Sequence, residues 1–121
     1  MLLVDDERPL LSLLKKFLER QGYLVDTAES GLEATQKCRQ TPCPFQLVVL
    51  DLHLPDIGGE EVMMTLTSES PDLRVLISSG TLWSTEGLPA ALQTRVGFLQ
   101  KPYMPKQLRE AIEALTAVAS R

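Results

Sequence analysis

The 121-residue sequence is poor in the residues that mark several classes of protein. It has two cysteines, Cys38 and Cys43, and a single histidine. Because no second cysteine pair and no histidine cluster accompanies them, a zinc site is not expected. We predict that both cysteines are free thiols in a reducing compartment.

Positive charge and long apolar runs are also scarce. Lys and Arg number 12 against 16 Asp and Glu, for a net charge of −4, which disfavours nonspecific binding to nucleic acid. No apolar run approaches the ~20 residues that cross a bilayer, and no signal peptide is evident. We therefore expect a cytoplasmic location, with no nucleic acid and no membrane contact by this domain.

What is present is an average globular composition, 44% hydrophobic and 23% charged, which argues against disorder. The length suits one domain, residues 1–121. Strand and helix patterns alternate along the chain. The expected strands are 2–4, 23–25, 47–50, 74–80 and 96–100. The expected helices begin at Pro9, with Gly22 as the C′ residue that follows the helix, at Ser30, ending near Thr41-Pro42, at Glu60, ending at about Ser68, and at Pro105.

This alternation predicts an α/β fold with a parallel sheet wound on both faces by right-handed crossovers. The segment 81–95 interrupts the pattern, because it contains Gly87 and Pro89. Proline is tolerated at the start of a helix but not inside one. We therefore predict an irregular loop followed by at most a short fourth helix, from Pro89 to about Arg95.

Asp51 follows the unbroken apolar run 47–50. A strand apolar on both faces belongs in the middle of a parallel sheet, and ligands bind at the carboxyl ends of such strands. Asp51 is therefore either a chemical group at a binding site or an ordinary residue that ends a strand or caps a helix.

The other strand ends favour the binding site. The first ends in Asp5-Asp6, the fourth in Ser79 and the fifth in Lys101. Alone, Lys101 could be a surface lysine and Ser79 a helix cap, but parallel strands bring all these ends to one edge. Converging carboxylates require a cation, and an all-oxygen site suits Mg²⁺. With Lys101 and Ser79 pairing to phosphoryl oxygens, the set predicts phosphoryl transfer onto the carboxylate of Asp51.

The motifs together resemble the receiver domain of two-component response regulators, over essentially the whole chain. They are Val4-Asp5-Asp6-Glu7, Leu50-Asp51-Leu52-His53-Leu54-Pro55 with Gly59, Ser78-Ser79-Gly80 and Phe98-Leu99-Gln100-Lys101-Pro102-Tyr103. The resemblance implies a flavodoxin-like, doubly wound five-stranded parallel sheet with strand order 2-1-3-4-5.

It also implies roles for single residues. Asp51 matches the phospho-acceptor, Asp6 a direct Mg²⁺ ligand, Asp5 an acid acting largely through water, and His53 a ligand through its backbone carbonyl. Three further residues belong to the response to phosphorylation: Ser79 matches the switch hydroxyl, Lys101 the phosphate-pairing lysine and Phe98 the switch aromatic that swings inward.

By the same resemblance, the donor is the phosphohistidine of a sensor histidine kinase or phosphotransfer domain. The isolated domain is not an enzyme, although it catalyses its own phosphorylation and dephosphorylation, and we expect a monomer or weak dimer. The motif at 98–103 is similar to receivers at the C-terminus of hybrid sensor kinases.

Three alternatives remain at this stage. A haloacid-dehalogenase-like phosphatase would have a D-x-D motif that begins at its nucleophile, whereas the residue two positions after Asp51 is His53. A flavodoxin-like cofactor binder needs a Ser/Thr/Gly-rich phosphate loop after the first strand, where this chain has Asp5-Asp6-Glu7. A pseudo-receiver scaffold would not use the acids at all.

Overall fold

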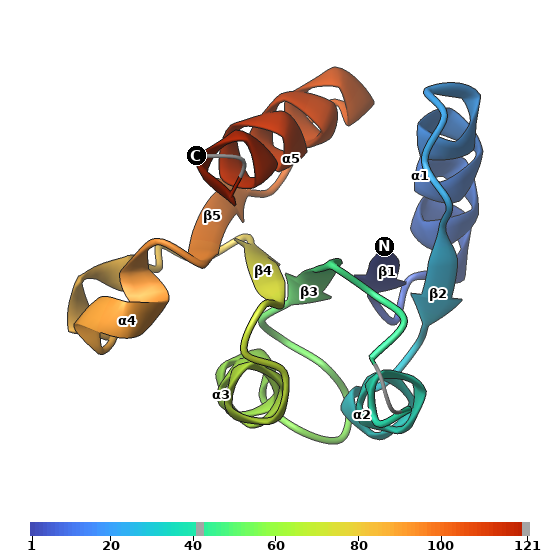
Figure 1. The fold of residues 1–121 in the computed structure, drawn as a ribbon. Helices are drawn as coiled ribbons and strands as arrows, with labels where there is room; N and C mark the ends of the chain where they lie inside the picture. The colour runs from blue at the N-terminus through green and yellow to red at the C-terminus, as the bar shows by residue number, and fades with distance from the viewer. Residues whose placement is uncertain (41–42, 120–121) are drawn as a thin grey trace.

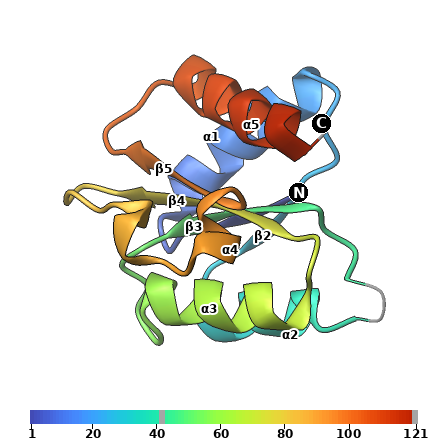
Figure 2. The same cartoon turned by 60° about the vertical axis from the view of Figure 1, so that its left-hand side comes forward.

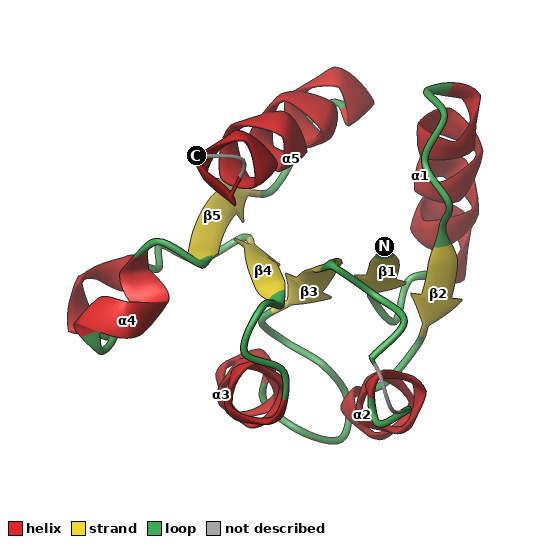
Figure 3. Ribbon diagram, in the orientation of Figure 1, coloured by secondary structure: helices red, strands yellow, loops and turns green. Residues whose placement is uncertain are grey.

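A parallel sheet of five strands in the order β2-β1-β3-β4-β5 runs through the centre of the molecule (Figures 1 and 3). The computed structural model describes residues 1–40 and 43–119. The strands are β1 Leu2–Val4, β2 Asp26–Ala28, β3 Leu47–Asp51, β4 Arg74–Ser79 and β5 Val96–Gln100. The helices are α1 Arg8–Arg20, α2 Gly31–Cys38, α3 Gly59–Glu69, the 3₁₀ turn η1 Thr85–Gly87, α4 Ala90–Gln93 and α5 Pro105–Ala119. The predicted flavodoxin-like fold and strand order are confirmed.

The helices cover the two faces of the sheet in separate layers. Figure 2 shows α1 and α5 on one face and α2 and α3 on the other. On the face covered by α1 and α5, β3 contributes Leu47 and Val49 to one apolar cluster. On the face covered by α2 and α3, it contributes Val48 and Leu50 to the other. All of β3 is buried, as expected for a strand covered on both faces. None of the helices in the described part of the chain could span a membrane.

Two predicted boundaries are wrong. The second strand is Asp26–Ala28 instead of 23–25, because Leu2 of β1 pairs with Asp26 and the ladder begins there. The apolar residues 23–25 only lead into it, and Leu24 is 89% exposed. Helix α2 ends at Cys38, before the predicted stop; Thr41 and Pro42 lie outside the described residues.

The weak fourth helix is confirmed. Helix α4 is 4 residues long and follows η1 and a loop. Arg95, at the end of this segment, donates hydrogen bonds from its guanidinium to the carbonyl oxygens of Ser70 at 2.7 Å and Leu73 at 2.9 Å. These bonds join the start of β5 to the chain that follows α3, so a short α4 is sufficient to connect β4 with β5.

Candidate functional site

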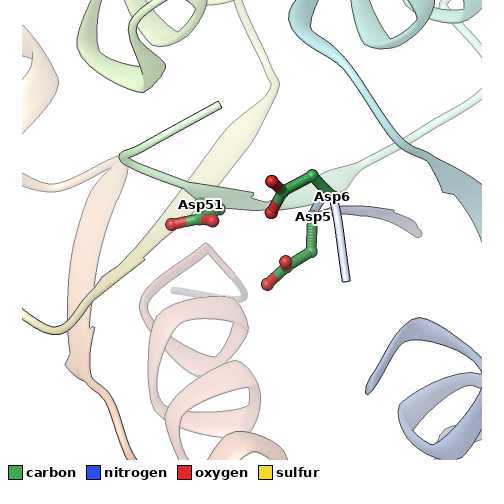
Figure 4. Close-up of side chains that lie close together, drawn as sticks. All are labelled: Asp5, Asp6 and Asp51. Atoms are coloured by element: carbon green, nitrogen blue, oxygen red, sulfur yellow. The ribbon is translucent and has the colours of Figure 1, made fainter. Parts of the chain in front are cut away.

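Three carboxylates meet at the carboxyl edge of the sheet. Asp5 and Asp6 follow β1, and Asp51 ends β3; one oxygen from each lies within 4.8 Å of the others. Figure 4 shows the side chains gathered at these strand ends. Asp5 and Asp51 are buried, at 5% and 6% exposed, while Asp6 is exposed. In the described part of the chain this is the one group of three or more acids, histidines or cysteines close enough to share a metal.

The register of the sheet explains this convergence. β1 and β3 are parallel neighbours, and Val4 lies opposite Leu50. The next residue on each strand, Asp5 and Asp51, therefore leaves the sheet at the same level. The apolar residues before both acids are buried in the core, so the strands cannot shift register without exposing them.

Lys101, just beyond β5, supplies the positive charge. Its Nζ lies 2.7 Å from Asp5 Oδ2 and 3.6 Å from Asp51 Oδ2. Burial lowers the pKa of Lys101, but the hydrogen bond to Asp5 and the charges of Asp5 and Asp51 outweigh this, so the pKa is raised overall. Lys101 therefore remains an ammonium group next to both buried acids.

Asp51 is the acid of this cluster whose pKa is raised. Burial raises its pKa, and the charges of Asp5 and Asp6 add to the rise; the His53 amide and Lys101 only partly oppose them. The His53 amide donates to Asp51 Oδ1 at 3.2 Å. Three ionised acids and one lysine leave the cluster with a net negative charge. An all-oxygen donor set with one open member, Asp6, fits a hard divalent cation such as Mg²⁺.

Added Mg²⁺ is therefore expected to stabilise the fold. A ligand that binds only the folded state, at a concentration ~100 times its Kd, adds about 2.7 kcal/mol to the free energy of unfolding. Thermal unfolding with MgCl₂ or EDTA measures this. The Mg²⁺-induced rise in Tm should be strongly reduced in Asp6→Asn and retained in Asp72→Asn, an exposed acid before β4 at the opposite edge. Equal rises in both variants would contradict a site at the acid cluster.

Ser79 and His53 are linked through a residue that sequence reasoning missed. Ser79, at the end of β4, is 1% exposed. Its Oγ accepts from the Thr81 amide at 3.0 Å and lies 2.9 Å from Thr81 Oγ1. His53 Nε2 lies 3.3 Å from the same Thr81 oxygen. A second hydroxyl two residues after Ser79 was the available signal, but the contact with His53 spans 28 positions.

Phe98 lies in β5 and is half-buried. It packs against the α2 and α3 side of the core. Its ring centroid is 6.0 Å from that of Trp83, in the loop after β4. The predicted switch aromatic thus contacts the irregular segment that follows β4.

The loop that follows Asp51 is held by Asp56. Its carboxylate accepts from the Gly31 amide at 2.8 Å and the Leu32 amide at 2.9 Å, at the first turn of α2. Ser30 caps the same helix by accepting from the Glu33 amide at 3.1 Å. The Ser30 cap is visible in the sequence, whereas the Asp56 contact crosses 25 positions.

Asp56→Ala is expected to lower the free energy of unfolding by about 1 kcal/mol, as for loss of a helix cap. The Leu32 and Gly31 hydrogen bonds lower the pKa of Asp56 from its ordinary value of 3.8. The contribution of Asp56 to the free energy of unfolding is therefore complete above its ordinary pKa. This contribution is lost as pH falls through the lower, folded-state pKa. Urea unfolding at neutral and acid pH measures this. A wild-type advantage over Asp56→Ala that grows with acidification, with Asp72→Ala as the reference, would contradict it.

Comparison with known proteins agrees with the geometry. The family model for the response regulator receiver domain matches residues 1–113. The photosynthetic apparatus regulatory protein RegA of Cereibacter sphaeroides is 30% identical over 114 residues, which cover 94% of this chain and 61% of RegA. The alkaline phosphatase synthesis transcriptional regulatory protein PhoP of Bacillus subtilis is 33% identical, with 94% of this chain and 47% of PhoP covered. The sensor kinase CckA of Brucella abortus is 28% identical, with 94% and 12% covered. The chain thus spans less than two thirds of these relatives.

Solved structures show the same similarity. A CheY-like response regulator receiver domain protein from Methanospirillum hungatei superposes with a TM-score of 0.82 and 29% identity, covering 98% of this chain and 94% of that one. The response regulator TrrA of Thermotoga maritima, solved in complex with Mg²⁺-BeF, gives a TM-score of 0.76 and 30% identity, covering 94% and 96%.

Proposed function

The chain belongs to the response regulator receiver domains, and from this premise we propose that Asp51 accepts a phosphoryl group from a phosphohistidine. The observation that carries the proposal is the meeting of Asp5, Asp6 and Asp51 at one edge of the sheet, with Lys101 beside Asp5 and Asp51. The family match gives no support to the phosphatase or cofactor-binding alternatives.

The transfer needs a nucleophile and groups that hold the phosphoryl oxygens. A carboxylate oxygen of Asp51 attacks phosphorus, the P–N bond breaks, and the imidazole nitrogen of the donor keeps the electron pair. Asp5, Asp6, Asp51 and the His53 carbonyl would hold Mg²⁺, with Asp5 acting largely through water because Lys101 and the Glu7 amide already occupy its oxygens at 2.7 and 3.0 Å. When bound, Mg²⁺ supplies charge neutralisation for the phosphoryl group.

Lys101 and Ser79 are placed to bind oxygens of the phosphoryl group once it is on Asp51. Lys101 Nζ is already 3.6 Å from Asp51 Oδ2, so a short movement pairs it with a phosphoryl oxygen. Ser79 Oγ accepts from the Thr81 amide and also shares a hydrogen bond with Thr81 Oγ1. Rotation of the Ser79 hydroxyl away from Thr81 Oγ1 lets it donate its proton to a second phosphoryl oxygen. Hydrolysis of the acyl phosphate returns Asp51 to its carboxylate form.

The movement of Ser79 couples the site to Phe98. Ser79 and Gln100 are paired across β4 and β5, and Phe98 lies on the same strand as Gln100. We expect phosphorylation to favour a state in which Phe98 moves inward and away from Trp83. The charge change at Asp51 is then read at the surface around β5, as in other two-state switches.

Trp83 is the one tryptophan in the sequence, so its fluorescence reports this movement. Phosphorylation with acetyl phosphate and Mg²⁺ is expected to change the emission of Trp83, because its ring loses the Phe98 ring now 6.0 Å away. The variant Phe98→Leu should phosphorylate to the same extent with a much smaller emission change. An unchanged emission in fully phosphorylated wild-type protein would refute the inward movement of Phe98.

The proposal as a whole is tested with acetyl phosphate as donor. Intact mass spectrometry should show one added phosphoryl group with MgCl₂ and a large loss of incorporation with EDTA. The variant Asp72→Asn should behave as wild type. Steady turnover of a phosphate ester such as p-nitrophenyl phosphate, without a phosphorylated protein species, would support a phosphatase instead.

The wider setting is part of the same proposal. We propose that residues 1–121 form one receiver domain in the cytoplasm, a monomer or weak dimer, which is not an enzyme in isolation. Its partner is a sensor histidine kinase or phosphotransfer domain, and its similarity to hybrid-kinase receivers stays a prediction. Transfer from a purified phosphorylated kinase, measured by radiolabel, tests the partner; a kinase variant without its phosphorylatable histidine should transfer nothing.

A further inference from the structure

The two cysteines lie together at the edge of the sheet opposite the acid cluster. Cys38 is the last residue of α2, and Cys43 precedes β3. Both line a pocket of about 530 Å³, whose wall also includes Arg39, Glu69 and Pro71. Arg39 Nε donates to Glu69 Oε1 at 2.9 Å across α2 and α3. Sequence reasoning treated the cysteines as separate free thiols.

The two thiols line the same pocket and pack against the same part of the core, but they differ in accessibility. Cys38 is 4% exposed and belongs to the core on the α2 and α3 side. Cys43 is half-buried, packs against that core, and donates from Sγ to the Phe45 carbonyl oxygen at 3.6 Å. Burial raises the pKa of the Cys38 thiol to about 12, and the neighbouring Cys43 adds to the rise.

A pair of neighbouring cysteines could bind a soft metal or undergo redox chemistry. A soft metal would need further ligands, but among residues 1–40 and 43–119 no third acid, histidine or cysteine joins the two thiols in a cluster of ligand atoms. Redox chemistry needs only the two sulfur atoms. One must be reachable and the other close enough to complete the bond.

We propose that Cys38 and Cys43 form a redox pair that a hydroperoxide oxidises to an intramolecular disulfide. Cys43, on the pocket wall, reacts first: its thiolate sulfur attacks the peroxide, the O–O bond breaks, and the sulfur becomes a sulfenic acid with release of hydroxide. The sulfur of Cys38 then attacks the sulfur of Cys43, and the S–O bond breaks. The thiol proton of Cys38 and the hydroxyl of Cys43 leave as water. One hydrogen peroxide therefore accepts the two electrons of the whole reaction, and the sulfenic acid of Cys43 passes this oxidation on to the disulfide.

The order of the steps follows from burial. A buried thiol with a raised pKa holds little thiolate, so Cys38 is a poor target for the oxidant on its own. Its position beside Cys43 on the wall of the same pocket gives it a high effective concentration for the second step. This site is independent of Asp51, because it lies at the other edge of the sheet.

The test uses the whole 121-residue chain, treated with hydrogen peroxide and then with dimedone, which captures sulfenic acids. Wild-type protein should lose two hydrogens in intact mass and take up little dimedone. A tryptic digest without reductant should then join the Cys38-Arg39 dipeptide to residues 40–74, because trypsin cuts after Lys37, Arg39 and Arg74. Reductant should separate the two peptides.

Two variants distinguish the roles of the thiols. In Cys38→Ser, dimedone should label residue 43 at many times the wild-type level, since the sulfenic acid persists. In Cys43→Ser, Cys38 should stay reduced. Wild-type protein that remains reduced, or accumulates dimedone as fast as Cys38→Ser, or forms only intermolecular disulfides, would overturn the proposal. None of these results depends on phosphorylation of Asp51.

Discussion

Replacing Asp51 with asparagine is expected to abolish phosphate incorporation while making the folded protein more stable. The first result follows because the amide cannot form the acyl phosphate. The second follows because burial, with the charges of Asp5 and Asp6, raises the pKa of Asp51. An ionised Asp51 therefore costs stability at neutral pH, and the neutral amide removes that cost.

The stability difference between Asp51→Asn and the wild-type protein depends on pH. Because the folded-state pKa of Asp51 is above its ordinary 3.8, the folded state binds this proton more tightly than the unfolded chain. The stabilisation that this proton gives the wild-type protein is complete below the unfolded-state pKa of Asp51. It is lost as pH rises through the folded-state pKa. The advantage of Asp51→Asn should therefore appear over this interval and persist at neutral pH.

Urea unfolding without Mg²⁺, across pH, measures the stability change, and mass spectrometry with acetyl phosphate measures incorporation. The matched control is Asp72→Asn, which removes one charge at the opposite edge of the sheet. A destabilised Asp51→Asn protein at neutral pH would contradict the electrostatic account. Undiminished phosphorylation of that variant would remove Asp51 as the acceptor.

Replacing Gly59 with alanine is expected to lower the free energy of unfolding by about 3 kcal/mol, the upper range for overpacking. A Cβ at this position would lie 2.4 Å from the backbone oxygen of Asp51 and 2.6 Å from Cα of Leu52. Both are backbone atoms at the end of a buried strand, so neither can move cheaply. The Gly59 amide also donates to the Leu52 carbonyl oxygen at 2.8 Å.

The neighbouring glycine provides the control. A Cβ at Gly58 would meet nothing within 4 Å, and its φ of −59° is open to alanine. Gly58→Ala should therefore be close to wild type in chemical denaturation, while Gly59→Ala loses stability and phosphorylates more slowly because the Asp51 backbone shifts. Equal stabilities for the two variants would contradict the close approach at Gly59.

The sequence was sufficient for the acid cluster because each residue follows a strand with a clear apolar pattern. Asp5 and Asp51 come together once β1 and β3 are neighbours, and Lys101 follows β5 in the same way. The edge strand β2 was misplaced because only the residues Asp26–Ala28 pair with β1, and they lack an apolar pattern. Pairing, which is non-local, determined that strand.

Contacts between side chains that are far apart in the sequence could not be predicted from it either. Thr81 lies between Ser79 and His53, and Asp56 holds the first turn of α2, yet neither has a local pattern that marks it. The packing of Phe98 on Trp83 depends on the path of the irregular segment before α4. Such contacts require the three-dimensional arrangement of loops, which local spacing does not contain.

The most direct measurement is the location of the phosphoryl group. Borohydride reduces an aspartyl phosphate to homoserine, so wild-type protein treated with acetyl phosphate and Mg²⁺ can be reduced, digested and sequenced by mass spectrometry. Residues 40–74 form one tryptic peptide that contains Asp51, Asp56 and Asp72. We predict homoserine at position 51 alone, dependent on Mg²⁺. Homoserine at 56 or 72 in place of 51, or no homoserine in a protein that gained phosphate, would contradict the assignment of Asp51 as the acceptor.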